Sequence, residues 1–109
     1  MDKEKVIDRL FELPGEIELA EENVISADRA LRSVKELLQE AEDKLLTSNV
    51  IDGKNAEIRS AQLRSFTAQE RELVTAAEYT LIRSKNQLSK LYNELRALQS
   101  IADLLKGAA

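Results

Sequence analysis

The chain has 109 residues, a formal net charge of −4, and no cysteine or histidine. These absences exclude a disulfide framework, a thiolate nucleophile and the usual nitrogen and sulfur ligands of zinc. A high share of charged residues (33%) beside few aromatic residues (4%) is typical of long helices or coiled coils and not of a compact mixed fold.

The first half of the chain repeats apolar residues in alternating steps of four and three. The repeat runs through Val6, Leu10, Leu13, Ile17, Ala20, Val24, Ala27, Leu31, Val34, Leu38, Ala41 and Leu45. A period of 3.5 residues is the pattern of a coiled-coil seam. Pro14 lacks an amide hydrogen and crowds the carbonyl of Leu10. We therefore predict a first arm that is kinked or broken at Pro14–Gly15, with a short helix at about 2–13 and a helix at 15–47.

The middle of the chain reads NVIDGKNAEIR and contains the turn-forming pair Asp52 and Gly53. We predict a bend over residues 48–54, in which Gly53 adopts positive φ and Asn55 or Asp52 caps the next helix. The backbone N–H groups at that helix start, with Lys54, Asn55 and Arg59, also form a candidate recognition site for an anion or a nucleotide phosphate. Ordinary bend and cap chemistry explains the same residues, and the sequence favours this simpler interpretation.

The second half carries the same repeat, and we predict one long helix over residues 55–106. Its seam runs through Val74, Ala77, Leu81, Ser84, Leu88, Leu91, Leu95, Leu98, Ala102 and Leu105, and upstream through Glu70, Phe66 and Leu63. Two amphipathic helices joined by a tight bend predict an all-α fold, an antiparallel two-helix coiled-coil hairpin that forms a single domain over residues 1–109.

A bend centred near Asp52 also predicts which residues face each other, since facing residue numbers then total about 104 or 105. The predicted seam pairs include Val6–Leu98, Leu13–Leu91, Ala27–Ala77 and Leu38–Phe66. Charged residues fit the same register, for example Arg32 opposite Glu72.

Two paired helices bury only one stripe each, which leaves a poor ratio of buried to exposed surface. Apolar residues off the seam gather toward the open end of the hairpin, where the two chain ends lie. They are Ile7, Phe11, Leu19, Ile82, Tyr92, Ile101 and Leu104. We predict that these side chains form the interface of a homo-oligomer, a bundle of helices from several copies.

The sequence contains no P-loop, dinucleotide-binding or nucleophile motif, so we expect a protein that is not an enzyme. The glutamates at positions 16, 18, 21 and 22 lack the closed loop of a divalent-metal site, and we expect no metal or cofactor. Apolar runs are too short to span a membrane, and residues 1–13 lack the apolar core of a secretory signal. We therefore expect a cytoplasmic location. The negative net charge makes direct nucleic-acid binding unfavourable.

Residues Gly53, Lys54, Asn55, Ala56, Glu57 and Arg59, with the leucine-rich stretch QLSKLYNELRALQSIADLL, resemble a group of small helical proteins of bacteriophages and prophages. That group shares a Gly-Lys-Asn-Ala-Glu-x-Arg motif, and the resemblance covers roughly residues 40–106. It implies no catalytic activity. It implies a phage or prophage context, the cytoplasm of a host bacterium, and a binding role near replication and recombination functions.

The leading prediction is a self-associating coiled-coil module that binds a protein partner of phage or host origin. One alternative is an accessory factor in nucleic-acid replication or recombination. A second alternative is an oligomer that sequesters a nucleotide signal and thereby counters host defence. The acidic balance and the absence of an aromatic stacking platform disfavour direct contact with DNA.

Overall fold

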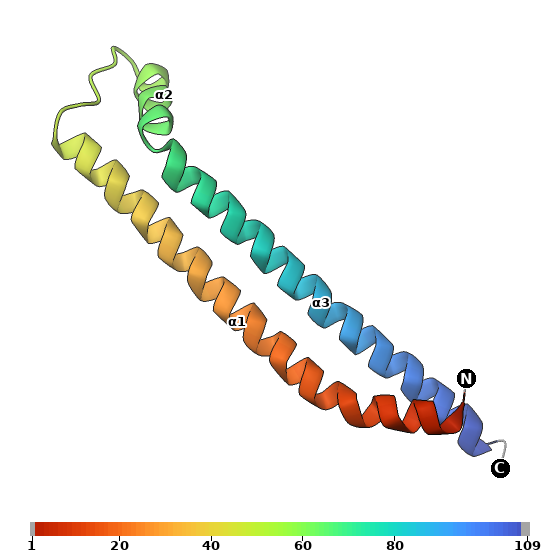
Figure 1. Ribbon diagram of the computed structural model, residues 1–109. Helices are drawn as coiled ribbons and strands as arrows, with labels where there is room; N and C mark the ends of the chain where they lie inside the picture. The colour runs from red at the N-terminus through yellow and green to blue at the C-terminus, as the bar shows by residue number, and fades with distance from the viewer. Residues whose placement is uncertain (1, 108–109) are drawn as a thin grey trace. The chain divides into compact units, whose positions relative to one another are not determined.

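The computed structural model describes residues 2–107 and contains three helices, α1 (Lys3–Thr47), α2 (Ala56–Phe66) and α3 (Ala68–Gly107) (Figure 1). No strand occurs within this described range. The residues pack as two compact units, an open-end unit (residues 2–26 and 82–107) and a bend unit (residues 27–81). In each unit α1 packs against α3, so the predicted all-α helical hairpin is confirmed.

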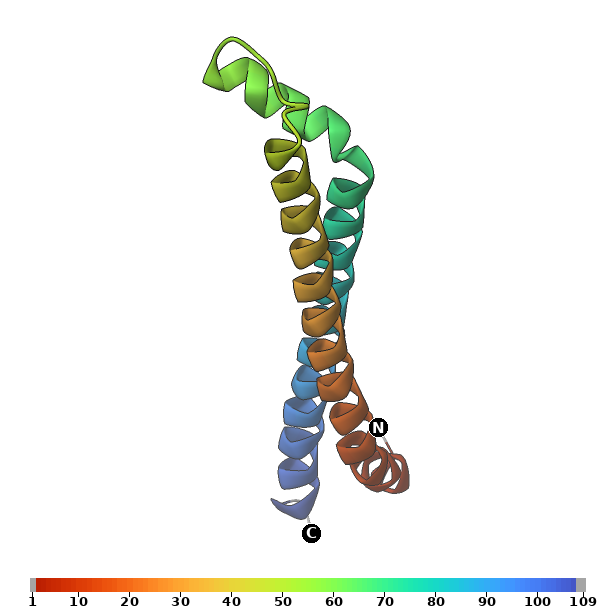
Figure 2. The ribbon, with the colours of Figure 1, turned by 90° about the vertical axis from the view of Figure 1, so that its left-hand side faces the viewer.

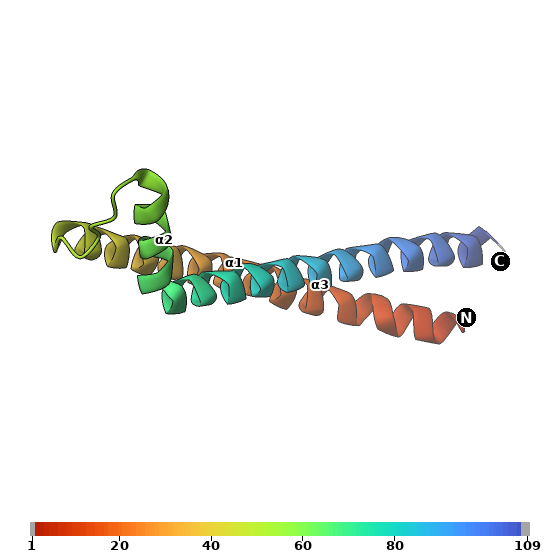
Figure 3. The same ribbon diagram turned by 90° about the horizontal axis from the view of Figure 1, so that it is seen from above.

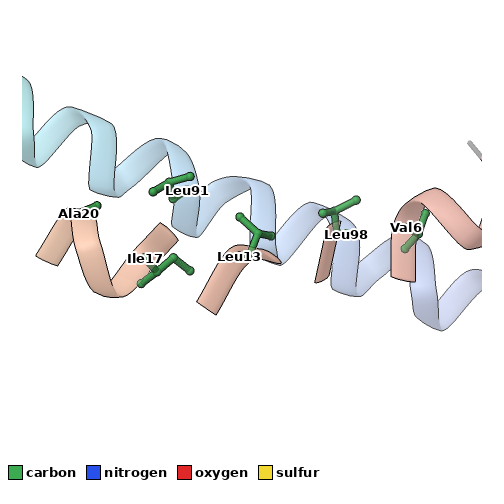
Figure 4. Close-up of a cluster of buried hydrophobic side chains, with 6 residues drawn as sticks. All are labelled: Val6, Leu13, Ile17, Ala20, Leu91 and Leu98. Carbon is green, nitrogen blue, oxygen red and sulfur yellow. The ribbon is translucent and has the colours of Figure 1, made fainter. Parts of the chain in front are cut away.

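The seam predicted from the 3.5-residue repeat forms the contact between the helices. Every seam residue of α1 from Val6 to Leu45 is buried or half-buried. The open-end unit holds a cluster of buried side chains, which are Val6, Leu13, Ile17, Ala20, Leu91 and Leu98 (Figure 4). Leu13 lies at the centre of this cluster and is 0% exposed. Burial of such a side chain stabilises the folded chain by about 1.5–3 kcal/mol.

Pro14 lies inside α1, which is one continuous helix from Lys3 to Thr47. Of the two predicted outcomes, the break into helices at 2–13 and 15–47 is therefore wrong, and Figure 1 shows that α1 instead bends toward its N-terminal end. A proline in a helix interior costs about 3 kcal/mol. Leu13 and Ile17, on the two sides of the proline, are both buried in the cluster. Their burial requires an unbroken heptad phase and contributes about 1.5–3 kcal/mol each, which offsets the cost of Pro14.

Thr67 interrupts the predicted long helix of residues 55–106, which is divided into α2 and α3. The backbone N–H and the hydroxyl of Thr67 both donate to the carbonyl of Leu63, at 3.1 and 2.6 Å. Such hydroxyl bonds to the preceding turn bend helices. Figure 2 shows α2 turned away from the line of α3.

Thr67 also takes the seam position that the sequence assigned to Phe66. Thr67 is 0% exposed, whereas Phe66 is 56% exposed. A strict alternation of four and three, continued upstream from Val74 through Glu70, leads to Thr67 and not to Phe66. The predicted Leu38–Phe66 seam pair is therefore wrong.

The register between α1 and α3 differs from the predicted one by about half a heptad. The seam residues occupy heptad positions a and d; Leu10 and Leu95 are at position a, and Ala20 and Leu91 are at position d. Position g directly precedes a, position e directly follows d, and the two positions flank the seam on opposite sides. In the open-end unit, Arg9 and Glu94 pair across one flank as g residues, and Glu21 and Tyr92 pair across the other as e residues. The residue numbers of these two pairs total 103 and 113. Because the seam lies midway between its flanks, the numbers of facing seam residues total about 108 instead of the predicted 104 or 105.

The bend unit shows the same departure from the predicted register. Glu42 and Arg71 pair as e residues, and their numbers also total 113. The predicted pairing aligned equivalent seam positions of the two helices. Coiled-coil side chains instead insert into the gaps between side chains of the facing helix, which requires the offset of half a heptad. The predicted pair of Arg32 with Glu72 is replaced by an ion pair of Arg32 with Asp28 in the preceding turn.

Helix α1 ends at Thr47, and Asn49 in the segment that follows adopts φ 60°. Asparagine tolerates this left-handed conformation and commonly ends helices in this way. No glycine among residues 2–107 has positive φ, so the positive φ predicted for Gly53 is wrong.

Candidate functional site

The start of α2 is capped by Asn55, which is one of the two capping candidates, Asn55 and Asp52, that the sequence offers. The side-chain oxygen of Asn55 accepts a hydrogen bond from the backbone N–H of Ile58 at 2.9 Å. Asn55 has an extended backbone, the usual conformation of a capping residue. Glu57 lies in the first turn of α2, where a negative charge is favoured by the helix dipole.

The segment between α1 and α2 is tied to α2 by a network of hydrogen bonds. The N–H of Gly53 donates to the Gln62 side-chain oxygen at 2.9 Å, and the Gln62 amide donates to Asp52 Oδ1 at 2.8 Å. Arg59 Nη1 donates to the carbonyl oxygen of Gly53 at 3.2 Å. Gln62 has no part in the sequence prediction, because a glutamine at that position carries no recognisable turn signal.

Gly53 is required in this network for close approach and not for an unusual backbone conformation. A Cβ atom on Gly53 would lie 2.6 Å from Ile58 Cγ2 and 3.0 Å from the backbone nitrogen of Arg59. Separations below 3.0 Å force neighbouring atoms to shift. The bend therefore packs its backbone directly against the first turns of α2.

The structure brings the three candidate recognition residues Lys54, Asn55 and Arg59 together around the start of α2, and all three are exposed. Two of them have structural partners, since Asn55 caps the helix and Arg59 holds the Gly53 carbonyl. These bonds favour the bend-and-cap interpretation over a built anion site.

The seven candidate interface residues all lie in the open-end unit. Phe11 is 82% exposed and Leu104 is 74% exposed. Ile7, Leu19, Ile82 and Tyr92 are also exposed, whereas Ile101 is half-buried and packs against the hydrophobic cluster. Ile101 therefore contributes mainly to the core of its own chain.

Polar side chains of the open-end unit form the two flanks of its seam. Arg9 donates two hydrogen bonds to Glu94, at 2.6 and 2.7 Å, and also pairs with Glu12 and Glu16. The Arg9 guanidinium lowers the pKa of the Glu94 carboxyl. Partial burial raises the pKa of the Tyr92 phenol, and the nearby Glu21 carboxylate adds to that increase. These contacts fix the register of the two helices.

The first turn of α1 and the last turn of α3 lie at the same end of the open-end unit (Figure 3). A small groove of about 250 Å³ lies there between the first turn of α1 and the last turns of α3. It is lined by Lys3, Val6, Ile7, Ala102, Leu105 and Lys106.

The bend unit contains a larger groove of about 640 Å³ that the sequence did not predict. Its lining is mainly apolar with three charged side chains, and the residues are Leu37, Glu40, Ala41, Lys44, Leu45, Ser48, Phe66, Glu70 and Leu73. Phe66, Leu37 and Leu73 are each about half exposed or more. The sequence feature that could have indicated this groove is the position of the three residues at heptad position g. Each of them directly precedes a seam residue, which is Leu38, Thr67 or Val74.

Within residues 2–107, no cluster of three acidic, cysteine or histidine side chains is arranged to hold a metal ion. The described helices include none with a segment long and apolar enough to cross a membrane. No protein-family model, curated protein or solved structure matches the chain. The chemistry of its surfaces therefore carries the functional inference.

Proposed function

We propose that this chain is a non-enzymatic, self-associating protein-interaction module that works in the cytoplasm of a bacterium as a phage or prophage accessory protein. Self-association uses the exposed apolar side chains of the open-end unit, and the partner is another protein.

The observation that carries the proposal is the exposure of Phe11 and Leu104. Phe11 shows 82% of its surface to solvent, on a helix whose opposite face is already buried. Burial of roughly 160 Å² of such a side chain would stabilise a complex by up to about 4 kcal/mol. Ile7 and Leu19 are exposed on the same helix. Apolar side chains gathered in this way mark an interaction surface more often than a free surface.

The phage context rests on the residues of the Gly-Lys-Asn-Ala-Glu-x-Arg motif. Three of them have structural roles, because Gly53 allows close approach, Asn55 caps α2, and Arg59 bonds the Gly53 carbonyl. A motif that specifies a bend supports a shared fold. It also leaves the helix faces as the surfaces for binding partners.

Sedimentation equilibrium over a wide range of protein concentration tests self-association. We expect a dimer or larger species at micromolar concentration, and we expect Phe11→Glu and Leu104→Glu to shift it toward monomer. Leu46→Glu is the control, because Leu46 is also exposed but lies in the bend unit. A folded monomer at every concentration would refute the proposal, as would equal effects of Phe11→Glu and Leu46→Glu.

A further inference from the structure

The groove of the bend unit lies on one flank of the seam, and the two flanks of this unit differ in chemistry. On the e flank, Arg71 bonds Glu42 at 2.8 Å, and its Nε donates to the Thr67 hydroxyl at 3.0 Å. On the g flank, Leu37, Phe66 and Leu73 are exposed and line the groove. The e flank is thus closed by polar bonds within the chain, whereas the g flank is apolar and open.

Apolar residues at a, d and g are typical of helices in bundles of three or more, whereas a two-helix coiled coil needs only a and d. The α1 side of the groove extends from Leu37 to Ser48, which corresponds to about 16 Å of helix. That length matches three turns of one further helix. Its natural occupant is therefore a helix with apolar residues at spacings of three and four.

The charges at the groove indicate which kind of helix fits. Glu40, Glu70 and Lys44 line it, and none of them takes part in the ion pairs among residues 2–107. Glu70 is half-buried at a seam position in the first turn of α3, where the helix dipole favours its charge but no ion pair neutralises it. Two carboxylates against one ammonium leave the groove acidic, and a basic side chain on the incoming helix would compensate them.

We infer that this groove is the docking site for a basic amphipathic helix of a partner protein, held by apolar side chains against Leu37, Phe66 and Leu73 and by a cation near Glu40 and Glu70. The inference deepens the proposed interaction role and places partner binding on a different unit from self-association. A second copy of this chain fits the groove less well. Two such grooves facing each other would bring together four carboxylates and only two lysines, and like charges at an interface are unfavourable.

The test uses two synthetic helical peptides of about fifteen residues with leucines at identical spacings of three and four, one with lysine and alanine elsewhere and one with glutamate and alanine. Fluorescence anisotropy at about 0.15 M salt measures binding to the full chain. We expect the lysine peptide to bind and the glutamate peptide to bind at least tenfold more weakly.

Matched variants of the protein locate the binding site. Leu73→Glu should weaken binding of the lysine peptide by at least tenfold. Phe66→Ala, which adds no charge, should also weaken binding of this peptide. Leu46→Glu is the control for Leu73→Glu, because both leucines are 52% exposed and Leu46 does not line the groove. Glu40→Gln should weaken binding severalfold, whereas Glu22→Gln, an exposed site in the open-end unit, should leave it unchanged.

Four results would overturn the inference. Three of them concern the peptides: no binding of the lysine peptide, equal binding of both peptides, or an equal loss of peptide affinity in Leu73→Glu and Leu46→Glu. The fourth is a change of oligomer size in Leu73→Glu, which would assign the groove to a second copy of the chain. Sedimentation of wild-type protein and of Phe11→Glu is measured separately. Failure of the docking site and failure of self-association are therefore distinguishable.

Discussion

Truncation of Leu13 to alanine should destabilise the chain far more than the same change at Leu46, another leucine of α1. Leu13 is 0% exposed and belongs to the buried cluster with Ile17, Leu91 and Leu98, whereas Leu46 is 52% exposed. Removal of three buried carbons from Leu13 costs about 2.4 kcal/mol in transfer free energy, and a residual cavity adds to that. Because a two-helix contact is open to solvent on its flanks, we expect the low end of the measured range, about 2–3 kcal/mol.

The same truncation at Leu46 should cost only about 1 kcal/mol, since half of the side chain is already in water and no cavity forms. Urea unfolding followed by circular dichroism at one fixed protein concentration measures both variants, because self-association adds to apparent stability by mass action. With a slope of about 1.5 kcal/mol per M, Leu13→Ala should lower the midpoint by roughly 1.5 M. Equal midpoint shifts for the two variants would refute the assignment of the seam as the core.

Three further predictions concern the cap, the register and the ion pair. Asn55→Ala should lower stability by about 1 kcal/mol in urea unfolding, and an unchanged midpoint would contradict its capping role. Cysteines at Ala27 and Leu81 should form an intramolecular disulfide faster than cysteines at Ala27 and Ala77, and the reverse order in a timed oxidation would restore the register predicted from the sequence. The pKa of the Glu94 carboxyl is lowered in the folded chain by the guanidinium that it binds. The Arg9–Glu94 ion pair therefore stabilises the folded chain fully above the unfolded pKa of about 4.3, and this stabilisation is lost as the pH falls through the folded pKa. When the free energy of unfolding is measured at decreasing pH, Glu94→Gln should lose less stability than the wild type.

The seam and the cap could be predicted from the sequence because each depends on local chemistry. Heptad spacing alone places Leu13 and Leu98 on buried stripes, and the position of Asn55 before a helix start identifies the cap. Both features are properties of a single segment.

The register could not be predicted in the same way, because it depends on how two segments interdigitate. The bend between α1 and α2 is long enough to allow several offsets, and residue numbers alone do not choose among them. The ion pairs of Arg9 with Glu94 and of Arg71 with Glu42 select the offset only after the helices are placed side by side.

Phe66 shows how a preference for apolar residues misleads when it competes with periodicity. Its hydrophobic side chain made it the attractive choice for the seam, yet the strict repeat places the polar Thr67 there. Thr67 satisfies its hydroxyl locally by donating to Leu63 and accepting from Arg71, so it is buried without an unmet hydrogen bond. A polar residue that supplies its own partners can therefore occupy a seam position, and the phase of the repeat outweighs the hydrophobicity of one residue.

The consequence of this displacement extends to binding. Because Thr67 occupies position a, Phe66 falls at position g beside the groove that Leu37 and Leu73 also line. Three large apolar side chains on one flank exceed what a two-helix contact can bury, and the opposite flank is filled by the bond between Arg71 and Glu42. Selection for a two-helix hairpin alone would place polar residues on both flanks, as Arg9 and Glu94 do on the g flank of the open-end unit. The apolar g flank of the bend unit is thus better explained by a third helix that packs there than by the stability of the hairpin itself.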